Sequence, residues 1–443
     1  MDRWIGRLNC IRSVNVFRCK ILLKIKLVWG TDMGVTPTSK LESGMVLAGE
    51  VRDISGRLLL AEGEVLQQTH IRVLKMWGVS EVNIVGEVDI PASPDADIDP
   101  DVWKETKDHT ALIFRHVDLD HPALGILFDL CVLFRSKHNG LVSGCDITPG
   151  EYDDSKNHIK REILKKIDDR QIQLPEIPSI VFELNEVIED PMASSENIAE
   201  VVNKSPSLTA NLLRIVNSPL YGFPNKVDKV SRAVTLIGTK EISSLALGIM
   251  MLTVFKDIPP DIMNMHSFLK HSLACGVISR ILAARKNLRE TEQLLVAGLL
   301  HDIGRLVVYA YFPELARKLL NRAFVSNQIL YQEEQAYLGC QHTDVAKYLL
   351  HKWKLPSNIE NNVVHHHNPS AAENNEQAAI IHLADIIANG LGFGTSGERM
   401  VPPLDTESWD NLKLSPNCFE SVIEQATHQL FALEVFLQGL ETR

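Results

Sequence analysis

Several features that define other protein classes are missing from this chain of 443 residues. Its 7 cysteines are scattered, and none stand in a Cys-x-x-Cys pair. We therefore expect no disulfide framework or zinc ribbon, and predict a reduced, cytoplasmic setting. The longest apolar run, residues 245–255, is shorter than the roughly 20 residues that a membrane helix requires. We therefore expect no stable membrane span.

Positive charge is also scarce, because the formal net charge is −11. This balance argues against nucleic-acid binding, which needs a clustered basic surface. The sequence shows no Gly-rich phosphate loop, no Ser-His-Asp order and no setting for a cysteine nucleophile. What remains is a chain with 45% hydrophobic and only 6% aromatic residues, a composition that suits a helix-rich protein.

The length predicts two or three domains. Changes in composition and periodicity divide the chain into six segments: a basic leader (1–32), a small β-rich module (33–90), a linker (91–104), a helical connector (105–170), a main helical domain (171–390) and a C-terminal helical tail (391–443). For the leader we favour translation that starts at Met33, with the preceding stretch unordered. An amphipathic helix on a membrane surface is the alternative.

The most informative feature of the main domain is the pair His301-Asp302 within an apolar helical stretch. An ionised carboxylate in such surroundings needs a cation or several hydrogen bonds. A divalent metal would supply that charge, and imidazole with carboxylate suits Fe, Mn or Zn. A hydrogen-bonded core pair is the structural alternative.

Further residues of the ligand type follow one another on amphipathic helical stretches. Helices can project such side chains into a shared bundle interior, which is how many di-metal sites are built. The series consists of His271, His301, Asp302, His342, the triple His365-His366-His367 and Asp385.

This order resembles that of HD-domain metal-dependent phosphohydrolases, among them the HD-GYP cyclic dinucleotide phosphodiesterases. The sequence is more similar still to the HDOD family, the HD-related output domain of bacterial signalling proteins. The resemblance covers about residues 170–390. It is carried by the blocks Leu174–Pro178, Ser205–Leu208, Leu212–Gly222, Ala233–Gly238, Phe268–Ser272 and Gly298–Gly304.

The resemblance implies an all-helical HD-type core behind the small mixed module. It also implies a metal site in two halves. One ion would be held by His271, His301, Asp302 and Asp385; a second, bridged by Asp302, would be held by His342, His366 and His367. Two such ions would activate water and clamp a phosphate. In an enzyme, Asp302 and Arg305 would be catalytic, with Arg305 meeting the phosphate.

The sequence departs from HD-GYP enzymes, because Asn368-Pro369-Ser370 follows the histidines and no Gly-Tyr-Pro does. HDOD proteins are usually regulatory, so our leading hypothesis is a cytoplasmic signalling protein that acts through a protein partner. The full ligand set favours the alternative, a phosphohydrolase acting on a nucleotide or cyclic dinucleotide. A homo-oligomeric scaffold with an inert, purely structural cluster is a third interpretation.

Overall fold

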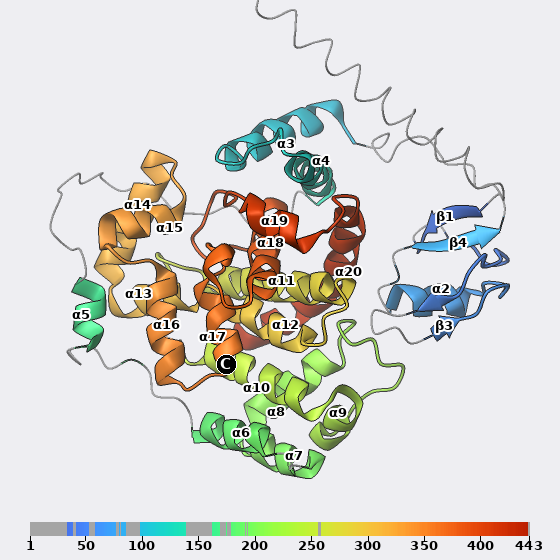
Figure 1. Cartoon of the computed structure of the whole chain (residues 1–443), viewed down its shortest axis with the longest axis horizontal. Helices are drawn as coiled ribbons and strands as arrows, with labels where there is room; N and C mark the ends of the chain where they lie inside the picture. Colours follow the sequence, from blue (N-terminus) through green and yellow to red (C-terminus); the bar gives the residue numbers. More distant parts are fainter. Residues whose placement is uncertain are drawn as a thin grey trace, which may run out of the picture. The chain divides into compact units, whose positions relative to one another are not determined.

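The computed structural model describes residues 33–38, 41–52, 58–76, 79, 81–85, 98–138, 162–168, 174, 179–190, 192, 194–255 and 258–441 (Figure 1). They fall into two compact units: one lies within residues 1–91, and the other comprises residues 76–78 and 92–443. The predicted leader, the first half of the predicted linker and the block at residues 175–178 lie outside the described residues. The boundaries of the six predicted segments stay a prediction.

The first unit is a small α+β module. Strand β1 (Met33–Pro37) pairs antiparallel with β4 (Glu81–Val85), and β2 (Val51–Arg52) pairs antiparallel with β3 (Leu58–Leu60). Helix α2 (Gln68–Met76) completes the module. Leu47, Leu66 and Leu74 are fully buried in its own core.

The second unit is helical. The helices before the His/Asp residues are α3 (Pro100–Ile113), α4 (Pro122–Lys137), α5 (Glu162–Asp168), α6 (Ser179–Glu189), α7 (Ser195–Asn203), α8 (Pro206–Val216), α9 (Val230–Ile237) and α10 (Thr239–Thr253). Those that follow are α11 (Met265–Arg285), α12 (Thr291–Leu300), α13 (Ile303–Tyr311), α14 (Pro313–Ser326), α15 (Leu330–Glu333), the π-helix η3 (Glu334–Leu338), α16 (His342–Lys352), α17 (Ser357–Val364), the 3₁₀ turn η4 (Pro369–Ala371), α18 (Asn375–Leu391), α19 (Thr406–Leu412) and α20 (Cys418–Glu441). The all-helical core is therefore confirmed.

Local sequence signals explain several of these boundaries. Ser205 accepts a hydrogen bond from the backbone N–H of Leu208, and Pro206 is the first residue of α8, a common way for a helix to begin. Asn217 ends α8, and its amide bonds both the carbonyl and the N–H of Val227 at 2.7 Å. Asn217 therefore pins the turn that follows α8.

Helices α11, α12 and α18 pack together at the centre of the helical unit (Figure 1). Glycines allow α11 and α12 to approach closely, because a Cβ on Gly298 would lie 2.7 Å from the Cα of Gly276. The contact brings the backbone of the helix that carries His271 close to that of the helix leading to His301.

The stretch Thr291–Tyr311 is long enough and apolar enough to cross a membrane, but it is largely buried within the protein. The sequence predicted one continuous helical stretch here, but the structure has two helices, α12 and α13. The regular helix stops at Leu300, and Asp302 has φ −100° and ψ 11° before α13 begins. The His301-Asp302 pair therefore lies at a junction, where a break in the helix can aim both side chains at the same point.

Candidate metal centre

The predicted ligand residues come from five places in the fold and meet in one cluster. His271 lies on α11, Asp385 on α18, and His342 is the first residue of α16. His301 and Asp302 lie at the α12–α13 junction, while His366 and His367 follow α17. Ligand atoms within 4.8 Å of one another form three groups: Asp302 with His342, His366 and His367; Asp302 with His271 and His301; and Asp385 with His301 and His366.

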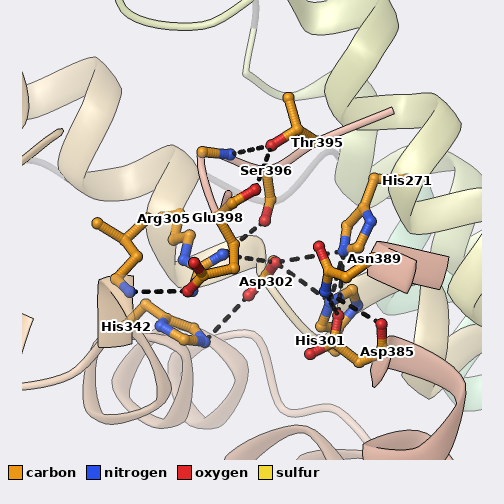
Figure 2. A network of polar contacts seen from close by, with 12 residues as sticks. His271, His301, Asp302, Arg305, His342, Asp385, Asn389, Thr395, Ser396 and Glu398 are labelled. Carbon is orange, nitrogen blue, oxygen red and sulfur yellow. Dashed lines mark hydrogen bonds and ion pairs between the residues drawn. The ribbon is translucent and has the colours of Figure 1, made fainter. Parts of the chain in front are cut away.

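The carboxylate of Asp302 stands between two pairs of histidines. Its Oδ2 atom lies 3.1 Å from Nε2 of His301 and 3.7 Å from Nε2 of His271. Its Oδ1 atom lies 3.0 Å from Nε2 of His342 and 4.0 Å from Nε2 of His366. Figure 2 shows Asp302 at the centre of this network. One carboxylate thus serves both halves of the cluster, as a bridging ligand would.

Asp385 closes the cluster from α18. Its Oδ1 atom lies 3.2 Å from Nε2 of His271 and accepts a hydrogen bond of 2.7 Å from the side-chain amide of Asn389. Because Asn389 is one helical turn further along α18, it holds this carboxylate toward α11 (Figure 2). A partner that orients a metal-ligating carboxylate in this way is common in metal sites.

Hydrogen bonds at the outer ring nitrogens fix the orientation of three histidines. The Nδ1 atoms of His301 and His366 lie 2.7 Å from the backbone carbonyls of Gly298 and Val363, to which they must donate. Nδ1 of His342 lies 2.6 Å from Oε2 of Glu334. In each ring Nε2 is the atom that faces the cluster, and in the neutral tautomer it carries a lone pair. Metal-binding histidines are typically oriented in the same way.

Burial and neighbouring charges together set the protonation of these groups. His271, His301 and His366 are 0% exposed, and Asp302 is 2% exposed. Burial would raise the pKa of Asp302, but Arg305, His301 and His342 outweigh it and hold that pKa well below its usual range. For His366, burial and the neighbouring His301 and His342 lower the pKa well below that of free histidine. The site thus keeps its carboxylate ionised and His366 neutral.

Arg305 lies beside Asp302, as expected from the sequence, but its Nε and Nη1 donors already bond groups inside the protein. Its Nη1 atom lies 3.0 Å from Oδ2 of Asp302 and 2.5 Å from Oγ of Ser396, and its Nε lies 3.1 Å from Oε1 of Glu334. The side chain is 2% exposed. Arg305 therefore binds two carboxylates inside the protein. Its role toward a phosphate stays a prediction.

Three residues of this site were not predicted from the sequence: Glu334, Asn389 and Ser396. Glu334 opens the π-helix η3, an irregularity often found at functional sites. None of the three belongs to a recognisable motif, and only the polar residues on an otherwise apolar α18 stretch gave a signal that could have identified Asn389.

The donor set fits a divalent metal. Among the residues that the structure describes, His367 is a cluster member whose two ring nitrogens are buried and have no hydrogen-bond partner. Buried polar atoms without partners are rare and call for an explanation, such as an ion. Imidazole and carboxylate ligands in this mixture suit Fe, Mn or Zn.

Two other histidines near the cluster, His365 and His382, are not part of it. His382 on α18 is buried, but its Nδ1 donates to the carbonyl of His366 and its Nε2 accepts the backbone N–H of Asp405. His365, next to the cluster in sequence, is partly exposed and contributes no ligand atom to any of the three groups.

Comparison with known proteins finds a family match within the helical unit. Residues 174–369 match the family model of the HDOD domain. A relative from Treponema pallidum (strain Nichols), named "Uncharacterized protein", is 24% identical over 207 residues; the match covers 46% of this chain and 39% of the relative. The chain thus spans well under half the length of that protein.

Two solved structures are similar in fold. A protein from Marinobacter aquaeolei VT8, provisionally named for signal transduction, has a TM-score of 0.50 at 16% identity, covering 92% of this chain and 96% of its own. An HDOD domain protein with unknown function from Geobacter sulfurreducens has a TM-score of 0.48 at 22% identity, covering 63% and 93%. At 16% identity, the similarity to the Marinobacter aquaeolei protein supports the helical fold and no statement about function.

Proposed function

We propose that this chain is a cytoplasmic regulatory protein that acts through contacts with a signalling partner, because residues 174–369 match the HDOD domain model. We further propose that its His/Asp cluster binds a divalent metal, either Fe, Mn or Zn. A bound ion would supply the positive charge that the buried carboxylates require, together with Lewis acidity at their oxygens.

The observation that carries this proposal is a ligand set that is complete and largely buried, with His367 alone among its members partly exposed. His271, His301, His342, His366 and Asp385 are between 0% and 3% exposed. Arg305, the residue expected to meet a substrate phosphate, is bonded to two carboxylates and a serine instead. A small ion fits such surroundings, whereas a nucleotide requires access to the ligand atoms. The arrangement therefore favours regulation over turnover.

The metal ligands would be divided as the two halves of the cluster suggest. His271, His301 and Asp385 would hold one ion together with Asp302, while His342, His366 and His367 would hold a second that shares Asp302. Glu334 and Asn389 would orient His342 and Asp385 from behind.

The second candidate function is a phosphohydrolase of the HD type. The sharing of Asp302 between two groups of histidines favours it, because a carboxylate between two ions is typical of two-metal hydrolases. In that case the chain would act on a nucleotide or a cyclic dinucleotide.

Turnover distinguishes the two functions. The full chain would be incubated with Mn²⁺ or Fe²⁺ and screened against phosphomonoesters, nucleotides and cyclic dinucleotides, beside Asp302→Ala and His365→Ala. His365→Ala is the matched control, because it removes an adjacent histidine outside the cluster. Metal-loaded protein without turnover supports the regulator. Turnover that Asp302→Ala abolishes and His365→Ala retains would establish the enzyme.

A further inference from the structure

The segment that joins α18 to α19 is irregular backbone buried inside the helical unit. Phe393 is 2% exposed, while Ser396 and Val401 are 0% exposed. Connecting segments usually run over the surface, because their backbone polar groups need partners. Residues 392–401, here called the strap, find those partners on four different helices.

The strap first contacts α11, the helix that carries His271, near its N-terminal end. The backbone N–H of Thr395 donates to the carbonyl of Ser267 at 3.1 Å. Gly394 makes this approach possible: its φ is +69°, and a Cβ there would lie 2.1 Å from the same carbonyl oxygen. No side chain fits at residue 394 without displacing the strap.

The second attachment is to α13, directly beside the cluster (Figure 2). Oγ of Ser396 accepts a hydrogen bond from Arg305, which also bonds Asp302, the carboxylate shared by the two halves of the cluster. The carbonyl of Ser396 accepts a hydrogen bond of 2.7 Å from the hydroxyl of Tyr309. A Cβ on Gly397, whose φ is +107°, would lie 2.4 Å from that hydroxyl oxygen.

Two further attachments hold the end of the strap. Oε2 of Glu398 accepts the backbone N–H of Leu330 in α15 at 2.7 Å, and its Oε1 accepts the N–H groups of Arg399 and Met400. The N–H of Val401 donates to the carbonyl of Ile113 at the end of α3. The strap is thereby tied to a helix that precedes the HDOD domain in the chain.

We propose that the strap controls the exchange of metal ions at the His/Asp cluster, with Ser396 and Tyr309 as its latch. This inference rests on the proposed metal binding. Because Arg305 bonds both Ser396 and Asp302, opening the strap removes one partner of Arg305 and loosens the hold of Arg305 on the carboxylate shared by the two halves of the cluster. Ions leave and enter when the latch is open.

The test measures how fast the full chain, loaded with Zn²⁺, loses the ion to excess EDTA. Ser396→Ala removes the hydrogen bond that Oγ accepts from Arg305, and Tyr309→Phe removes the one that the carbonyl of Ser396 accepts. Gly397→Ala pushes the strap away from Tyr309. Removal of one buried hydrogen bond should speed release about tenfold. Ser370→Ala and Gly238→Ala are matched controls: Ser370 bonds Asp405 beyond the strap, and Gly238 has φ +119° but meets only the side chain of Glu241.

Faster release from the latch variants, with release from both controls at the wild-type rate, supports the strap. Wild-type rates in Ser396→Ala and Tyr309→Phe, with Zn²⁺ still bound, overturn it and leave the proposed metal binding intact. A wild-type chain that binds no Zn²⁺ refutes both. Tyr309→Phe keeps the buried ring, so at least one latch variant preserves the packing if Gly397→Ala fails to fold.

Discussion

His271 and His301 face each other through their Nε2 atoms, 3.3 Å apart, although they lie 30 residues apart in the chain. Nδ1 of His301 donates to a backbone carbonyl, so only a proton or a cation can favourably occupy the space between the two Nε2 atoms. Burial opposes the charged form of His301, but Asp302, Cys275 and Asp385 outweigh burial and raise its pKa well above the ordinary value.

The two halves of the cluster should lose metal separately. We expect His342→Ala to abolish the ion held with His366 and His367, and His271→Ala to weaken the other, because each removes a ligand from only one group that contains Asp302. Metal titration followed by calorimetry would count the remaining ions. Equal, complete loss of both ions in each variant would contradict two separable halves, while His365→Ala should bind like the wild type.

Arg305 should be essential for the stability of the metal-free protein. Arg305→Met leaves the buried carboxylates of Asp302 and Glu334 without their shared cation, so we expect a loss of about 3–5 kcal/mol in the free energy of unfolding. Urea denaturation after chelator treatment would measure it. The exposed pair of Arg317 with Asp261 offers a control, and Arg317→Met should change stability little. A small effect of Arg305→Met would contradict the assigned contacts.

Gly304 should tolerate no side chain. A Cβ at this position would lie 1.9 Å from the carbonyl oxygen of His342, so Gly304→Ala must push α16 away from α13 and displace His342. We expect both lower thermal stability and weaker metal binding, measured by thermal melts with and without Zn²⁺. Gly248→Ala is the matched control, because its Cβ would make an ordinary contact of 3.4 Å with Val296. Equal behaviour of the two variants would refute this account of Gly304.

We expect the free energy of unfolding to decrease as the pH falls, in part because His382 becomes protonated. Burial lowers the pKa of His382, whose Nε2 must stay unprotonated to accept the N–H of Asp405. The unfolded chain binds this proton near pH 6.5 and the folded chain only at lower pH, so the contribution is complete above that pH and is lost as the pH falls below it. Urea unfolding of metal-free protein between pH 5 and about 8 should show a shallower acid loss in His382→Gln. An unchanged slope would contradict the prediction.

The sequence predicted the helical core and the seven cluster residues because both depend on residue types that recur in a fixed order. Ser205-Pro206 predicted the start of a helix, and the series from His271 to Asp385 predicted side chains that face a shared interior of the helical bundle. The break at His301-Asp302 was missed, because apolar residues continue on both sides and hide the change of direction.

The contacts behind the cluster could not be predicted from the sequence. Glu334 reaches His342 from a π-helical turn, and Ser396 reaches Arg305 from 91 residues away. Such partners depend on how helices pack, which periodicity does not encode. The same packing gave Arg305 its internal partners, where the residue type alone had suggested a phosphate.

The central claim is that the converging histidines and aspartates bind metal, and elemental analysis of the full chain purified without chelators tests it most directly. We predict about one to two ions of Fe, Mn or Zn per chain, and a large loss of that metal in Asp302→Ala, which removes the ligand shared by both halves. A folded wild-type protein that contains no metal, and takes up none when Fe²⁺, Mn²⁺ or Zn²⁺ is added, would contradict it.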